Sequence, residues 1–202
     1  SLRAALQSNT SGLRPAPRFN GPRFQSTIVG AALDEAKLDD DPAHQLASTA
    51  LNEARTDARA TLASLPADRT SLVLSTTKAN IEALERLSDS RPCSDAARRH
   101  LQPDFLAADL AAEVGVGGPV QTISVACVSG LIAVMQGAKL IQRGAADAVF
   151  VVGVDHLSAF VMAGFTALKA IDPLGCRPFD RDRCGLTPGE AGAAIVLVRG
   201  DL

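Results

Sequence analysis

The segment that decides the fold is VQTISVACVSGLIAVMQGAKLIQRG, residues 120–144. Residues 120–126 read as a strand, and residues 128–143 then read as a helix that Gly144 closes as a C-terminal cap. The first half of this helix is apolar on every side, which is typical of a helix buried in a core. The continuous apolar run 147–154, DAVFVVGV, follows and predicts a strand covered on both faces, as in parallel sheets.

The rest of the chain repeats this alternation of strands and helices. A buried strand is expected at 70–75 and a closing strand at 191–198, with a long loop over 172–189. We expect helices at 42–65, at 79–87, from Pro103 to just before Gly115, and at 158–171. Asp41 is the expected N-cap of the first of these helices, because Pro42 suits the first helical position. The pattern predicts an α/β fold with a layered sheet, and we expect one domain over residues 1–202.

Composition excludes several classes of protein. The chain has 202 residues, a net charge of −2 and 47% hydrophobic residues, which is enough apolar material for a core and excludes disorder. Only 3% of residues are aromatic, without Trp or Tyr, so a nucleic-acid-binding surface is not expected. No apolar run approaches the roughly 18 residues of a membrane span, and residues 1–6 lack the apolar core of a secretory signal. The start without Met suggests processing or truncation.

The four cysteines predict a reducing compartment, and we expect a cytoplasmic protein. Their spacing is irregular and includes no CxxC pair, so neither a disulfide framework nor a zinc site is favoured. Cys176 and Cys184 have no His or further Cys at ligand spacing, and packing within the loop is the expected role. No cofactor or metal is predicted. The acidic run 39–41 is interpreted as an approach to the positive end of the following helix rather than as a metal site.

Cys127 is the candidate nucleophile. It lies where the strand 120–126 meets the helix, and a helix N-terminus favours thiolate over thiol through its free N–H groups and partial positive charge. The same N–H groups can stabilise an oxyanion, and Ser129 and Gly130 keep the first turn small enough for a substrate carbonyl. The alternative is that Cys127 is only a small buried hydrophobic residue.

The histidines and arginines have other expected roles. His156 follows Asp155, and a Cys–His–Asp hydrolase is an alternative that we do not favour. His44 and His100 lie in polar stretches and are expected at the surface. The loop 8–25 carries three arginines and no acid, which fits a solvated loop or a landing site for an acidic partner.

Several motifs resemble the β-ketoacyl synthases, the elongating condensing enzymes of fatty-acid and polyketide synthesis. The flanks of Cys127 resemble their nucleophile motif, and residues 177–186, RPFDRDRCGL, followed by GEAGAA at 189–194 resemble their RPFD segment. An AGF element at 163–165 and SGLRP at 11–15 also match, so the resemblance covers nearly the whole chain. STTKANI at 75–81 and DHLSAF at 155–160 are most similar to synthases of the aryl-polyene type.

The resemblance implies a thiolase-like fold, of which this chain is the N-terminal half without the first strand and the C-terminal half. It implies a decarboxylative Claisen condensation in which Cys127 accepts an acyl group from an acyl carrier protein and malonyl-carrier protein supplies the carbanion. The backbone N–H of Cys127 would be one oxyanion donor. The family's histidines, lysine and second oxyanion donor belong to its C-terminal half, so this chain alone is not expected to complete turnover.

Further implications concern the acyl pocket and the partners. Leu186 stands where many members have Phe, and the resemblance implies that it lines the acyl pocket. The charged residues of the 172–190 segment could be acid–base machinery, but we favour a structural network that folds the loop over the site. These residues are Arg177, Asp180, Arg183 and Glu190. We expect a homodimer or a synthase/chain-length-factor heterodimer; the alternatives are a non-catalytic chain-length-factor-like partner and a fold-retaining interaction domain.

Overall fold

The structure is a computed structural model that describes residues 7–8, 10–35 and 38–200. The chain divides into two compact units. The first comprises the chain up to Leu38 together with Leu157–Glu190, and the second comprises Asp39–His156 together with the chain from Ala191 onwards. Each unit is described by itself. In the described part of the chain, no helix is both long and apolar enough to cross a membrane.

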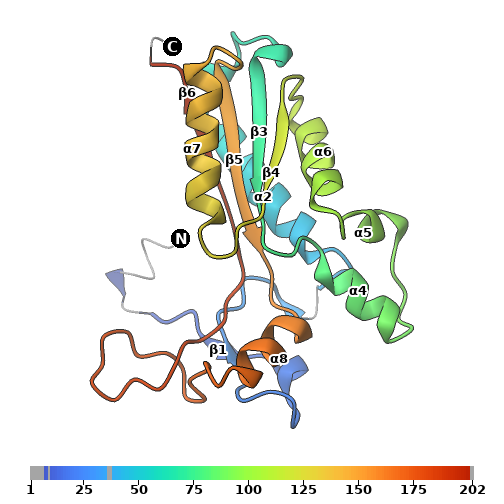
Figure 1. Cartoon of the computed structure of the whole chain (residues 1–202), viewed down its shortest axis with the longest axis vertical. Coiled ribbons are helices and arrows are strands. Elements are labelled where there is room, and N and C mark those ends of the chain that lie inside the picture. The colour runs from blue at the N-terminus through green and yellow to red at the C-terminus, as the bar shows by residue number, and fades with distance from the viewer. Residues whose placement is uncertain (1–6, 9, 36–37, 201–202) are drawn as a thin grey trace. The chain divides into compact units, whose positions relative to one another are not determined.

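A four-stranded sheet in the order β4-β3-β5-β6 forms the centre of the second unit (Figure 1). Its strands are β3 (Thr70–Ser75), β4 (Val120–Ile123), β5 (Ala148–Asp155) and β6 (Ala191–Val198). β3 runs parallel to both β4 and β5, and β6 pairs antiparallel with β5. The carboxyl ends of β3, β4 and β5 therefore meet at one edge of the sheet, because Ser75 lies opposite both Ile123 and Gly153.

Helices cover both faces of this sheet. The helices α2 (Pro42–Asp57) and α6 (Pro103–Val114) pack together and against one face, and α7 (Ser129–Gln142) packs against the other. A hydrophobic cluster joins α7 to β3 and β5 through residues such as Val73, Ala133 and Val149. Gly137 allows a close approach, because a Cβ there would lie 3.0 Å from side-chain atoms of Val151 and Leu197. Three short helices, α3 (Arg59–Leu62), α4 (Ile81–Ser88) and α5 (Asp95–Arg99), and the turn η3 (Ala67–Arg69) complete the unit.

The first unit is smaller. It contains the antiparallel pair β1 (Arg14–Pro15) and β2 (Ile28–Val29), the 3₁₀ turn η1 (Pro17–Phe19) and the helix α8 (Ala159–Ala167). A hydrophobic cluster holds it together, formed by Ala16, Phe19, Val29, Leu157, Met162 and Ile171. Residues 168–190 are mostly loop, as the sequence predicts.

The structure confirms the four sheet strands and most helices, and it corrects several boundaries. The expected helix 42–65 breaks at Ala58, whose ψ of 5° ends α2, so α3 is a separate turn. The strand expected over 120–126 ends at Ile123, because the chain turns before Cys127. The helix expected over 158–171 ends at Ala167, and α5 was not predicted. Gly115, in a left-handed conformation with φ of 76°, ends α6 as expected.

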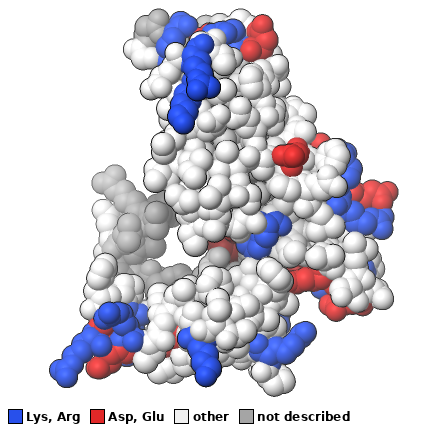
Figure 2. Space-filling view, in the orientation of Figure 1, with Lys and Arg blue, Asp and Glu red and all other residues white. Residues whose placement is uncertain are grey.

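The prediction that α7 is buried on all sides is wrong for this chain. Its buried residues are Ser129, Ala133, Gly137 and Leu140, which share one face. Leu131 and Met135, on another face, are 64% and 50% exposed. Figure 2 shows a broad uncharged surface over the middle of α7. The sequence pattern measures only how apolar a helix is, whereas burial depends on which elements are present to cover it.

Candidate functional site

Cys127 lies in a tight turn between β4 and α7. Ser129, the first residue of α7, organises this turn with its hydroxyl, which accepts a hydrogen bond from the Val125 N–H at 2.7 Å and donates to the Ala126 carbonyl at 2.7 Å. Ala126 has φ of 48°, in the left-handed region that alanine rarely adopts. Such a conformation costs about 1–3 kcal/mol and persists only where the surroundings fix it. The chain therefore holds Cys127 in a specific, strained position.

The Cys127 thiol is accessible. The residue is exposed, and it lies two residues before the first residue of α7, where backbone N–H groups lack helical partners. Val125 and Val128 beside it are exposed as well. The interpretation of Cys127 as a small buried hydrophobic residue is thus wrong in this structure. A Cβ on Gly130 would meet nothing closer than the Ser75 hydroxyl at 4.0 Å, so the first turn of α7 leaves open space.

A polar cluster that the sequence analysis did not single out lies at the same edge of the sheet. Asp155, the last residue of β5, accepts four hydrogen bonds on Oδ1, from the Thr76 hydroxyl, the Thr77 N–H, the Thr77 hydroxyl and the Lys78 ammonium. The ion pair with Lys78 is 3.0 Å long. A sequence signal did exist, because residues 76–78 follow a predicted buried strand and Asp155 follows a strand predicted to belong to a parallel sheet.

Each of the three histidines is buried or bonded to a carboxylate. His156 follows Asp155 but is buried, with 1% of its surface exposed. The prediction that His100 is a surface residue is wrong, since it is 3% exposed and its two ring nitrogens bond Asp41 at 2.5 Å and Asp109 at 2.9 Å. His44 is partly exposed and stacks on His100, with its Nε2 bonding Glu113.

The His100 ring is buried between two carboxylates. Burial alone lowers the pKa of His100, but the hydrogen bonds to Asp41 and Asp109 outweigh it, so the pKa is raised above its usual value. Asp41 also caps α2 as predicted, accepting from the His44 N–H. The neighbouring acids also accept hydrogen bonds from backbone groups. Asp39 accepts one from the Asp41 N–H, and Asp40 accepts one from the Ser94 N–H. The acidic run is therefore a structural feature of the helix start.

Leu186 belongs to the first unit, whereas Cys127 belongs to the second. Leu186 is 39% exposed and its backbone N–H donates to the Ala170 carbonyl at 2.8 Å. The charged residues near it bond within their own loop: Arg177 pairs with Asp172 and donates to the Asp182 carbonyl. The hydrogen bond from the Leu174 N–H and the nearby positive charge of Arg177 lower the pKa of Asp172, although burial acts in the opposite direction.

Glu190 joins two segments of the first unit through hydrogen bonds. Its buried carboxylate accepts hydrogen bonds from the N–H groups of Ala32, Leu33 and Leu157, and Arg18 lies 3.6 Å away. The structural interpretation of Glu190 is confirmed by these contacts. Arg18 is also 3.5 Å from Glu35, so its charge is neutralised within the unit rather than presented to an acidic partner.

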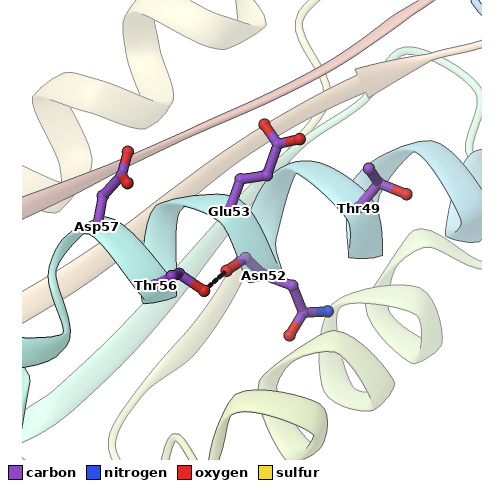
Figure 3. A pocket seen from close by; sticks show the side chains of 5 residues that line it. All are labelled: Thr49, Asn52, Glu53, Thr56 and Asp57. Carbon is purple, nitrogen blue, oxygen red and sulfur yellow. Dashed lines mark hydrogen bonds between the residues drawn. The ribbon is translucent and has the colours of Figure 1, made fainter.

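The remaining candidates in the described part of the chain are metal sites and surface pockets. Within the described residues, no group of three or more His, Cys, Asp or Glu side chains could hold a metal ion, and Cys93, Cys127, Cys176 and Cys184 are free thiols. A surface depression of about 500 Å³ lies along α2. The side chains that line it are Thr49, Asn52, Glu53, Thr56 and Asp57 (Figure 3). Thr56 donates to the carbonyl of Asn52 in its own helix, and none of the five lining residues is a cysteine or a histidine.

Comparison with known proteins gives this site its context. The model of the family described as "Beta-ketoacyl synthase, N-terminal domain" matches residues 18–201. The chain belongs to the beta-ketoacyl synthase family. Cys127 and the 177–186 loop both lie within the matched segment.

Two solved beta-ketoacyl synthase structures show the same fold. A beta-ketoacyl synthase from Burkholderia phymatum STM815 has a TM-score of 0.81 at 22% identity, covering 99% of this chain and 55% of that chain. The ishigamide ketosynthase/chain length factor has a TM-score of 0.80 at 25% identity, covering 98% of this chain and 54% of that chain. This chain therefore has the α/β fold of ketosynthases and spans about half of these relatives.

A curated relative is more similar in sequence over a shorter segment. The tetracenomycin polyketide synthase ketoacyl synthase alpha subunit of Streptomyces glaucescens is 41% identical over 102 residues, which is 47% of this chain and 24% of that protein. The 3-oxoacyl-[acyl-carrier-protein] synthase 2 of Staphylococcus aureus is 32% identical over 104 residues, which is 48% of this chain and 25% of that protein. The relatives thus include a polyketide synthase subunit and a 3-oxoacyl-[acyl-carrier-protein] synthase.

Proposed function

We propose that this chain supplies the nucleophile of a β-ketoacyl-acyl-carrier-protein synthase, and that residues 1–202 are part of its N-terminal domain. The observation that carries the proposal is Cys127, exposed before the first turn of α7 and preceded by a left-handed alanine. A thiol in that position can be reached by an acyl thioester, and helix N-terminal N–H groups can stabilise the charge that develops on its carbonyl oxygen. The family to which the chain belongs supports this reading.

The reaction proceeds through a covalent intermediate. The Cys127 sulfur, as thiolate, attacks the carbonyl carbon of an acyl group on a carrier protein, and the carrier thiolate leaves and takes up a proton. Malonyl-carrier protein then loses CO₂, and its carbanion attacks the Cys127 thioester. The Cys127 thiolate is released, and the product is a β-ketoacyl group on the second carrier. We assign no part of the decarboxylation step to His100, since its ring is held by two aspartates.

The partners follow from the same proposal. An acyl carrier protein would deliver both thioesters, and a solved neighbour is a type II acyl-carrier protein in complex with its ketosynthase. A homodimer or a heterodimer with a chain-length factor is proposed, and a ketosynthase from Xenorhabdus doucetiae was solved with its chain length factor. We also propose a cytoplasmic location. Leu186 is proposed to line the acyl pocket. A Leu186→Phe variant tests this, because the larger side chain should narrow the range of acyl chains that the enzyme accepts.

The acceptor role of Cys127 can be tested directly. The chain is treated with a limiting amount of iodoacetamide near neutral pH, or with an acyl-carrier protein, and the modified residue is located by mass spectrometry. We expect modification of Cys127 ahead of the other three cysteines and none at that position in Cys127→Ser. The matched control is Cys184→Ser, because Cys184 is also exposed and should be dispensable. Uniform labelling, or none at Cys127, would favour a non-catalytic chain-length-factor-like partner or an interaction domain.

A further inference from the structure

The carboxyl edge of the sheet carries a second feature beside the Cys127 turn. The loop that follows β3, residues 76–80, contains Ala79 in a left-handed conformation with φ of 46°. Ala126, in the turn that follows β4, has almost the same φ of 48°. Two neighbouring parallel strands thus both end in strained backbone at non-glycine residues. Strain of this kind collects at functional sites and needs surrounding contacts to hold it.

Asp155 supplies those contacts for the loop after β3. One of its oxygens accepts four hydrogen bonds, at 3.3, 3.1, 2.7 and 3.0 Å, from Thr76, Thr77 and Lys78. The Thr76 hydroxyl oxygen in turn accepts the Ala79 N–H at 3.0 Å, which fixes the left-handed residue itself. The Lys78 side chain is 13% exposed, so its charge depends on Asp155 for compensation.

The fixed loop supports the turn that carries Cys127. The Thr76 N–H donates to the Ile123 carbonyl at 3.2 Å, which extends the β3–β4 ladder by one bond. The Ser124 hydroxyl donates to the Thr77 carbonyl at 3.4 Å. These two bonds join the loop to Ile123 and Ser124, the residues that precede the Cys127 turn.

We propose that Asp155 is a positioning residue for Cys127, which acts through Thr77 and Lys78 by holding the loop after β3 against the Cys127 turn. This role rests on the proposed function only in taking Cys127 as the nucleophile. Asp155 does not touch the reacting atoms; it sets the geometry of the backbone that holds them. Displacement of a reacting group by about 1 Å can cost up to about a hundredfold in rate, so support of this kind matters for a nucleophile.

The test compares Asp155, the last residue of β5, with Asp147, which lies directly before the first residue of β5. Asp155→Ala and Asp147→Ala are prepared in the full chain, and the rate of iodoacetamide alkylation at Cys127 is measured relative to that at Cys93. We expect Asp155→Ala to lower this ratio by about threefold to tenfold, since misplacement slows reaction. We expect Asp147→Ala to leave the ratio unchanged, although it also removes an ion pair. An unchanged ratio in folded Asp155→Ala overturns the proposal.

Two further variants separate positioning from general stability. Thr77→Ser keeps the hydroxyl that donates to Asp155 and should retain the parent ratio, whereas Thr77→Val should lower it. Equal ratios in Thr77→Ser and Thr77→Val would contradict the proposal, because Ser keeps the hydroxyl that donates to Asp155 and Val replaces it with a methyl group.

Amide hydrogen exchange keeps the test independent of the nucleophile role. If the parent chain shows no selective alkylation at Cys127, the proposed function fails, and exchange then decides the present inference alone. Asp155→Ala should speed exchange of the amides in residues 124–129, and Asp147→Ala should not. Exchange in that segment that Asp155→Ala leaves at the parent rate overturns the positioning role.

Discussion

The two ends of β3 and β5 are joined by ion pairs of different kinds. At the amino end, Arg69 forms two 2.9 Å hydrogen bonds with the two carboxylate oxygens of Asp147, and Arg199 adds a third at 2.6 Å. At the carboxyl end, a single oxygen of Asp155 collects four donors from one loop. The amino-end pair ties regular strands together, whereas the carboxyl-end pair holds a strained loop.

The amino end of the sheet thus contributes to stability, whereas the carboxyl end carries the candidate nucleophile. In open sheets with parallel strands, ligands bind outside the carboxyl ends of the strands, where the loops carry functional side chains. Here Cys127 and both left-handed alanines of the loops after β3 and β4 lie at that end. The amino end is instead closely packed, since a Cβ on Gly118 would lie 2.4 Å from the Thr70 carbonyl oxygen.

The largest effect should come from crowding the amino end. Gly118→Ala places a methyl group 2.4 Å from the Thr70 carbonyl oxygen and 2.9 Å from that of Asp68, so the backbone must shift. We expect the free energy of unfolding to fall by about 3 kcal/mol, measured by urea denaturation. Gly153→Ala in β5 is the control, because its Cβ meets nothing within 4 Å. Equal stability of the two variants would show that the amino end is not tightly packed.

The next effect concerns His100, which anchors the far side of the carboxyl-end loop by accepting the Asn80 N–H on its carbonyl oxygen. His100→Gln removes the buried imidazole that bonds Asp41 and Asp109, and we expect a loss of about 2 kcal/mol near pH 6. His44→Gln is the control, since His44 is partly exposed and should cost less.

The pH dependence of the His100 effect has a defined sign. The pKa of His100 is raised in the folded chain by Asp41 and Asp109, against the lowering effect of burial. Its contribution is therefore complete below the unfolded pKa of about 6.5 and is lost as pH rises through the folded pKa. The stability difference between the parent and His100→Gln should shrink in alkali, as urea denaturation at several pH values would show. A difference that grows with pH would contradict a raised pKa of His100.

The amino-end ion pair should show the opposite pH dependence and a smaller effect. The hydrogen bonds from Arg69 lower the pKa of Asp147, and burial opposes this only in part. The stability that Asp147 contributes is present above its unfolded pKa of about 3.9 and is lost as pH falls through the folded pKa. Asp147→Asn should lower the Tm near neutral pH, and the difference should vanish in acid. Asp68→Asn, beside Arg69, is the control and should change the Tm less.

The smallest effect on stability is expected at the carboxyl end itself. Gly130 lies in the first turn of α7 with open space around its Cα, so Gly130→Ala should gain up to about 1 kcal/mol from helix propensity. The added methyl group narrows the approach to Cys127, and its alkylation should slow. Urea denaturation and iodoacetamide labelling of one preparation measure both effects. A variant that is clearly less stable would mean that this turn is as crowded as the amino end.

Much of the fold was available from local sequence. The apolar runs 70–75 and 147–154 predict buried strands because such runs are stable only when covered on both faces. Gly115 predicts the end of α6 because glycine readily adopts the left-handed conformation that ends many helices. The observed φ of 76° agrees with this prediction. The position of Cys127 between a strand and a helix follows from the same local patterns, and the motifs around it placed the chain in its family, which the match over residues 18–201 confirms.

Tertiary structure decided the properties that depend on distant neighbours. His100 looked like a surface residue because its own segment is polar, but Asp41, from 59 positions away, bonds its buried ring and helps to raise its pKa. The exposed face of α7 looked buried because apolar character says nothing about which elements cover it. Asp155 became the hub of a loop 77 to 79 positions away only because parallel pairing brings the ends of β3 and β5 together. Sequence patterns report the preferences of a segment, whereas burial, ion pairing and strain are set by segments that meet only in the folded chain.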